Sequence, residues 1–106
     1  MWRLDVSSEA ELEIFEAAFR FERERAGLGF RFEAQVNTVF ARLRENPLQF
    51  PAIEEGARRA LVDDFPYGIF FTIDADVVTV LAVLHLHRHP ETWKRRRVPG
   101  KPDTDA

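Results

Sequence analysis

The sequence contains no cysteine among its 106 residues. Disulfides and thiolate metal sites are therefore excluded, and the composition suits a reducing compartment such as the cytoplasm. No apolar run approaches the roughly 20 residues that a membrane-spanning helix needs. The opening stretch, MWRLDVSSEAELEI, interrupts its apolar residues with charges and lacks the pattern of a signal peptide. We therefore expect a cytoplasmic protein that has no membrane partner.

Basic residues do not outnumber acidic ones, and the formal net charge is −3. A protein that held nucleic acid over its whole surface would usually be basic. Positive charge is instead concentrated near the C-terminus, where Arg88 is followed by the run Lys94, Arg95, Arg96 and Arg97. The length suffices for one domain. We expect this domain to span residues 1–97 and to be followed by a disordered polar tail over residues 98–106.

The first half of the chain has the periods of one strand and two helices. Residues 2–6 alternate apolar and charged side chains, which predicts a short half-buried strand. Ser8 and Glu11 form a capping-box pattern at the start of a helix that runs to about Ala26. A Gly-Leu-Gly stretch ends this helix. A second helix follows and ends before Pro47, so we expect an antiparallel helical hairpin.

The apolar face of the first helix is wider than one contact with a sheet requires. Phe15, Phe19 and Phe21 spread over more than half of the helix circumference at about 100° per residue. These three rings cannot all point at one sheet. Apolar surface should therefore remain exposed, and a large exposed patch usually marks an interface. We take Phe15, Phe19 and Phe21 as candidate residues for binding a protein partner.

The second half changes to the period of a sheet. Segment 58–65 alternates weakly, and segments 67–74 and 77–87 are rich in β-branched and aromatic residues. All three are predicted strands. The links between them are short, so neighbouring strands should be antiparallel. The last segment is the most apolar and should be central. After Pro90 a short helical turn is expected. The order predicts an α+β domain in which an N-terminal strand and a helical hairpin accompany a small antiparallel β-sheet.

Three stretches of the chain resemble the RelE/ParE superfamily of toxins from type II toxin–antitoxin pairs, and the ParE branch in particular. They are the strand–helix opening, GLGFRFEAQVNTVFARLRENPLQFP, and RRALVDDFPYGIFFTIDADVVTVLAVLHLHRHPETWKRR. Together they cover nearly the whole chain except the tail. The resemblance implies a small toxin that is neutralised by an antitoxin encoded in the same operon. ParE members poison DNA gyrase, whereas RelE members cut messenger RNA in the ribosomal decoding site.

Three functions are consistent with this resemblance. The first is a gyrase inhibitor that acts by binding and has no catalytic residue or cofactor. The second is a ribosome-dependent messenger RNA endonuclease, and the third is a non-toxic family member that only binds its antitoxin. We expect the cognate antitoxin to wrap the domain with a segment that folds on binding. Operator DNA would be contacted only through the antitoxin, in a homodimer or a toxin–antitoxin heterotetramer.

Three histidines, His85, His87 and His89, alternate at the end of the last predicted strand. Residues two apart share one face of a strand, so the spacing is compatible with a metal site. No obvious carboxylate or thiol completes a ligand set, and we expect no metal. The ribonucleases of the superfamily place arginines where this chain has Gly68 and Leu86. The resemblance therefore favours inhibition by binding over RNA cleavage.

The candidate target-binding residues are cationic, imidazole and aromatic side chains of the later strands and of the C-terminal segment: Arg58, Arg59, His85, His87, Arg88, Trp93, Lys94, Arg95 and Arg96. If the chain cut RNA, His85 or His87 with the arginines would supply the acid–base groups and the cations. Simpler interpretations also exist. Of Arg58 and Arg59, one would be solvated and the other would pair with Asp63 or Asp64, and Trp93 would anchor the C-terminal turn in the core.

Overall fold

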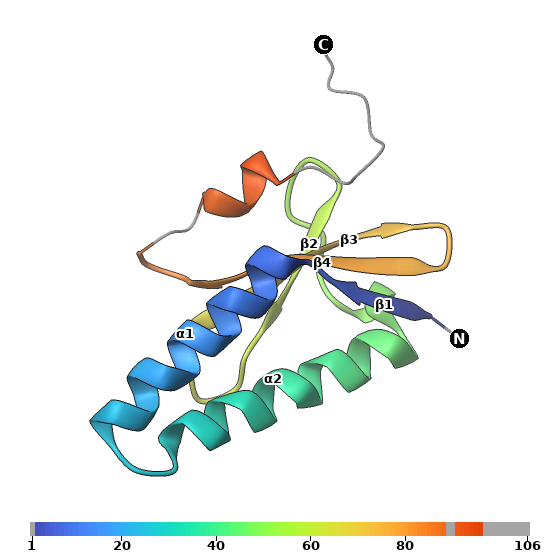
Figure 1. The fold of residues 1–106 in the computed structure, drawn as a ribbon. Helices are drawn as coiled ribbons and strands as arrows, with labels where there is room; N and C mark the ends of the chain where they lie inside the picture. The colour runs from blue at the N-terminus through green and yellow to red at the C-terminus, as the bar shows by residue number, and fades with distance from the viewer. Residues whose placement is uncertain (1, 89–90, 97–106) are drawn as a thin grey trace.

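The computed structural model describes residues 2–88 and 91–96 of the chain. Its elements are β1 (Arg3–Val6), α1 (Ser8–Glu24), α2 (Leu28–Glu45), η1 (Pro47–Gln49), β2 (Ala57–Leu61), β3 (Tyr67–Asp74), β4 (Val77–His85) and η2 (Thr92–Arg95). Figure 1 shows the two helices as a hairpin on one side of the sheet and η2 on the other side. His89, Pro90, Arg97 and the predicted tail lie outside the described residues.

The sheet has four strands in the order β1-β4-β3-β2, so β4 is central as predicted. The strands β2, β3 and β4 pair antiparallel, whereas β1 runs parallel to β4 from Arg3 opposite Val77 to Val6 opposite Val80. The α+β class, the helical hairpin and the C-terminal turn are confirmed, but the sheet is mixed and not purely antiparallel. The expectation that neighbouring strands are antiparallel holds for strands joined by short links. It does not extend to β1, because a helical hairpin and two strands separate β1 from β4 along the chain.

Polar groups and a glycine set the ends of the two helices. Ser7, and not the predicted Ser8, caps α1, because its hydroxyl oxygen accepts a hydrogen bond from the amide of Ala10 at 3.1 Å. The helix ends at Glu24, slightly before the predicted end. Gly27 then has φ of 89°, a left-handed conformation that favours glycine. This residue reverses the chain, and α2 starts immediately afterwards.

The two helices approach each other closely near their connection. A methyl group on Gly29 would lie 2.4 Å from the carbonyl oxygen of Ala18. Both residues are buried. At this point the two helices therefore contact each other through backbone atoms and a small side chain.

An aromatic cluster fills the space between the helices and the sheet. Phe21 of α1, Phe32 of α2, Phe65 and Tyr67 form five ring pairs with centroids 4.9–5.9 Å apart. Such tilted and edge-on pairs add to the stabilisation that burial provides. Val78, Val80 and Val83 of β4 continue the same core. The helical hairpin is thus fixed to one face of the sheet.

A second apolar cluster covers the opposite face of the sheet. Phe70, Leu84 and Trp93 belong to it, together with partly buried Ile53 and Leu86. The ring of Trp93 stacks on Phe70 with centroids 5.6 Å apart and planes 9° apart. The C-terminal segment therefore packs on the sheet from the side that the helices leave open. Within the described part of the chain, no helix combines the length and the apolar character needed to cross a membrane.

Candidate functional site

The outer face of the helical hairpin carries an apolar groove. Phe15 and Phe19 of α1 are 63% and 57% exposed, Phe30 of α2 is 74% exposed, and Leu12 is 55% exposed. The rings of Phe15 and Phe19 stack with centroids 6.4 Å apart. Together with Ala18 and Gly29 the three rings line a groove of about 230 Å³. We call these groove-lining residues and Leu12 the outer helical patch.

The third predicted aromatic residue, Phe21, does not belong to the outer helical patch. Its half-buried ring packs into the interior aromatic cluster, 5.3 Å from Phe32 between centroids. Helical spacing separates the two groups, because Phe15 and Phe19 are four residues apart whereas Phe21 lies about 200° further round than Phe19. Phe30, which the sequence analysis did not single out, completes the groove from the second helix.

Two carboxylates line the groove beside the rings. Glu22 accepts hydrogen bonds from the amides of Gly27 and Gly29 at 2.8 and 2.9 Å and so stabilises the helical connection. Glu33 of α2 is the other charged residue that lines the groove. The groove therefore combines exposed aromatic surface with negative charge.

Neither arginine of β2 pairs with the aspartates expected from the sequence. Arg58 donates a hydrogen bond from Nη1 to the carbonyl oxygen of Phe50 at 2.7 Å. Arg59 is partly buried, and its Nε has no hydrogen-bond partner among the described residues. Asp64 instead pairs with Arg31 at 3.3 Å. The predicted pairing of an arginine with Asp63 or Asp64 is therefore wrong.

The end of β4 brings two histidines together. The ring of His85 lies 5.4 Å from Tyr67 and 5.8 Å from His87, measured between centroids. The amide of His87 donates a hydrogen bond to Nδ1 of His85 at 3.1 Å. His89 lies outside the described residues. Within the described ranges, no three side chains of the histidine, cysteine, aspartate or glutamate type come together as a metal site.

The C-terminal segment is attached to the fold through Trp93 and Lys94. Trp93 is only 4% exposed and stacks on Phe70, which agrees with the interpretation as a core anchor. Lys94 pairs with Glu91 and, at 2.9 Å, with Glu54. Its hydrogen bonds with Glu91 and Glu54 raise the pKa of Lys94 above the usual value. Of the C-terminal cations among the target-binding candidates, Arg95 is exposed.

Arg96 and Glu13 join the C-terminal segment to α1 in a two-point ion pair. Nη2 of Arg96 lies 2.9 Å from Oε2 of Glu13, and Nη1 donates to Oε1 at 3.0 Å and to the carbonyl oxygen of Leu81 at 3.1 Å. Oε1 of Glu13 also accepts a hydrogen bond from the amide of Val83 at 2.9 Å. The side chains of Arg96 and Glu13 are 23% and 19% exposed. Arg96, proposed from sequence as a target contact, thus has a structural role here.

Replacing Glu13 with alanine is expected to lower the free energy of unfolding by about 2–3 kcal/mol, since it leaves a partly buried guanidinium and the amide of Val83 without their acceptor. Urea denaturation measures the change. The matched control is Asp5→Ala, which removes an ion pair whose side chains are 71% and 50% exposed and should cost less than about 1 kcal/mol. Equal costs for the two variants would contradict the structural role of Glu13.

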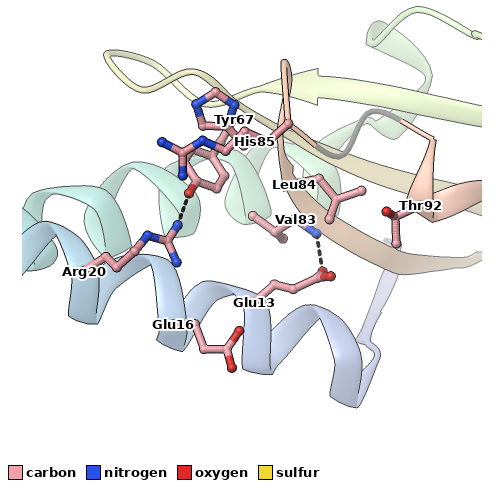
Figure 2. A pocket seen from close by; sticks show the side chains of 9 residues that line it. Glu13, Glu16, Arg20, Tyr67, Val83, Leu84, His85 and Thr92 are labelled. Carbon is pink, nitrogen blue, oxygen red and sulfur yellow. Dashed lines mark hydrogen bonds between the residues drawn. The ribbon is translucent and has the colours of Figure 1, made fainter.

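A cleft of about 380 Å³ lies between α1, the end of β4 and η2. Figure 2 shows Arg20 reaching from α1 to Tyr67 and Glu13 reaching to the amide of Val83. Nη2 of Arg20 donates to the hydroxyl oxygen of Tyr67 at 2.5 Å. The charged side chains that line the cleft have both signs, and they are Glu13, Glu16, Arg20 and Arg88. The imidazole of His85 also lines it.

Some of the predicted target-binding residues line the cleft, and others do not. His85 and Arg88 line it, whereas Arg58, Arg59 and His87 do not. Sequence reasoning missed Glu16 and Arg20. Their i, i+4 spacing on a helix is a weak signal, because the same spacing occurs on any solvated helical face.

Comparisons with known proteins agree with this fold. The family model described as "ParE toxin of type II toxin-antitoxin system, parDE" matches residues 5–90. A chain of a solved structure entitled "Chromosomal ParDE TA system from P. aeruginosa" superposes with a TM-score of 0.71 at 12% identity, over 80% of this chain and 96% of that chain. No curated protein matches. The match of the family model covers most of the sequence, and the chain therefore belongs to the ParE toxin family of type II toxin–antitoxin systems.

Proposed function

We propose that this chain is a toxin that inhibits DNA gyrase by binding and that is neutralised by an antitoxin seated on the outer helical patch. The observation that carries the proposal is the exposure of Phe15, Phe19 and Phe30 around one groove. Contiguous aromatic surface of this kind is costly to leave in water and usually marks an interface. Family membership supplies the class of partner, namely the antitoxin of a two-protein system.

The shape and charge of the groove indicate what kind of segment would bind there. The small residues Ala18 and Gly29 line it between the rings, so the groove has room for an incoming apolar side chain. An amphipathic helix or extended segment that folds on binding suits such a surface. Because Glu22 and Glu33 line the groove, we expect the segment to place lysine or arginine beside its apolar anchors.

Inhibition by binding is supported over RNA cleavage by the packing around Gly68. A methyl group there would lie 2.9 Å from Cδ2 of Leu86 and 3.3 Å from Cδ of Arg59. The superfamily's ribonucleases are expected to have an arginine at this place, and here a long side chain would have to displace its neighbours. The exposed cations Arg88 and Arg95 are the strongest remaining candidates for contact with gyrase or with the DNA that gyrase holds.

Purified protein tests this proposal against purified gyrase. We expect the wild-type chain to block supercoiling of a plasmid and to accumulate cleaved plasmid. Arg88→Ala and Arg95→Ala should weaken the effect, whereas Arg3→Ala, an exposed cation on β1, should not. Cleavage of messages during translation, lost on changing His85 or Arg88, would instead identify a ribonuclease. Normal growth on expression without the antitoxin would identify a non-toxic member.

A further inference from the structure

We propose that the cleft between α1, the end of β4 and η2 binds a small phosphate-bearing molecule. The site is separate from the outer helical patch, because the two sets of lining residues have no member in common. Binding there does not depend on the proposed inhibition of gyrase. The relevant groups are Arg20, Tyr67, His85 and Arg88, with Glu16 at the same cleft.

The cleft exists because β4 is longer than its neighbour β1. The pairing of the two strands ends at Val6 and Val80, whereas β4 continues to His85. Helix α1 starts at once after β1 and passes beside this extension of β4. Thr92 of η2 contributes to the lining from the C-terminal segment. A volume of about 380 Å³ lies within the range of roughly 300–1,000 Å³ that small-molecule sites occupy.

Arg20 is an exposed residue at the cleft whose guanidinium is oriented by a hydrogen bond. Its Nη2 donates a hydrogen bond to the hydroxyl oxygen of Tyr67. Tyr67 as a residue is only 3% exposed. A guanidinium has five N–H groups, so others remain available after this bond. A fixed guanidinium loses less side-chain entropy when it binds an anion than a mobile one. Figure 2 shows Arg20 extending from α1 toward Tyr67, with His85 beside Tyr67.

The balance of charge favours an anion. Arg96 neutralises Glu13 through two short contacts, so this carboxylate repels an anion less than its position suggests. Arg20 and Arg88 remain as cations, with Glu16 as the opposing charge. Two guanidinium groups beside an imidazole suit a phosphate, which offers several acceptor oxygens to forked donors. The same two cations disfavour a metal ion.

Titration followed by NMR tests the proposal, because Tyr67 is the only tyrosine of the chain, so its ring signals are identified without ambiguity, and it lines the cleft. Inorganic phosphate and adenosine monophosphate are added to the full chain at constant ionic strength. We expect saturable shifts at Tyr67 and His85. Tighter binding of adenosine monophosphate than of inorganic phosphate would mean that the cleft also contacts the nucleoside. Equal affinities would mean that the cleft contacts the phosphate group alone.

Charge variants give effects of opposite sign. Arg88→Gln and Arg20→Gln should weaken binding about tenfold or more, whereas Glu16→Gln should strengthen it about twofold. Arg23→Gln is the matched control, because Arg23 lies on the same helix over the ring of Phe19 and outside the cleft. Arg88 is exposed in a turn, so its variant keeps the fold even if Arg20→Gln does not.

Two results would overturn the inference. One is the absence of saturable shifts with either compound, including the case in which only a single-stranded oligonucleotide binds. The other is binding that Arg88→Gln and Arg23→Gln weaken equally, since that would reflect general attraction of anions to the surface. Neither result affects the gyrase assay, so failure of this inference is distinguishable from failure of the proposed function.

Discussion

Replacing Phe15 and Phe19 together with serine is expected to weaken antitoxin binding by about 100-fold or more, because aromatic anchors in the centre of an interface each contribute about 2 kcal/mol or more. The fold should be retained, since the two rings are 63% and 57% exposed and stack on each other at the surface. Calorimetric titration with the product of the adjacent reading frame measures the affinity. In cells the antitoxin should no longer rescue growth.

Leu61→Ser is the matched control for the double variant. Leu61 is an apolar side chain with 54% exposure, similar to that of Phe19, but it lies on β2 and not on the helical hairpin. The Leu61→Ser variant should bind the antitoxin with the affinity of the wild-type chain. If the double variant also keeps that affinity while its thermal transition is unchanged, the outer helical patch is not the antitoxin site.

Replacing Trp93 with alanine is expected to lower the free energy of unfolding by about 3–5 kcal/mol, the cost of removing a large aromatic side chain from a core. Trp93 is 4% exposed and stacks on Phe70 across a centroid distance of 5.6 Å. The loss would also release the segment that carries Lys94 and Arg96 from the sheet. Urea denaturation followed by circular dichroism measures the effect.

The control for Trp93 is its exposed neighbour Arg95, whose replacement by alanine should change stability by less than about 0.5 kcal/mol. The pair of variants separates two roles for the C-terminal segment. A core anchor loses stability on substitution, whereas a target contact loses inhibition and keeps its stability. A Trp93→Ala variant that folds as well as the wild-type chain but no longer inhibits gyrase would refute the structural role assigned here.

Local periodicity in the sequence predicted the helices and strands. It did not predict features that depend on contacts between residues far apart in the sequence. The hydrophobic spacing of the helices and the short links of β2, β3 and β4 are local signals, and the structure follows them. The direction of β1 depends on β4, more than 70 residues away. The contact of Arg96 with Glu13 joins residues 83 positions apart, so a run of basic residues gave no sign of it.

The candidate sites show the same division between local and distant information. Phe15 and Phe19 could be recognised from helical spacing alone, whereas assigning Phe21 to the core required knowledge of where Phe32 and Tyr67 lie. The cleft was not predictable from the sequence, because it forms where β4 extends beyond the end of its pairing with β1. Only the folded chain brings Arg20, Tyr67 and Arg88 to one place.

The parallel pairing of β1 with β4 has a consequence for synthesis of the protein. Translation produces Arg3–Val6 before the helical hairpin, β2, β3 and Val77–His85, yet within the described sheet β1 pairs with β4 alone. The nascent chain therefore cannot complete the described sheet until β4 has been synthesised, and such non-local pairing also slows folding. A copy terminated before residue 77 would lack the strand on which α1 packs, so it should not form this fold.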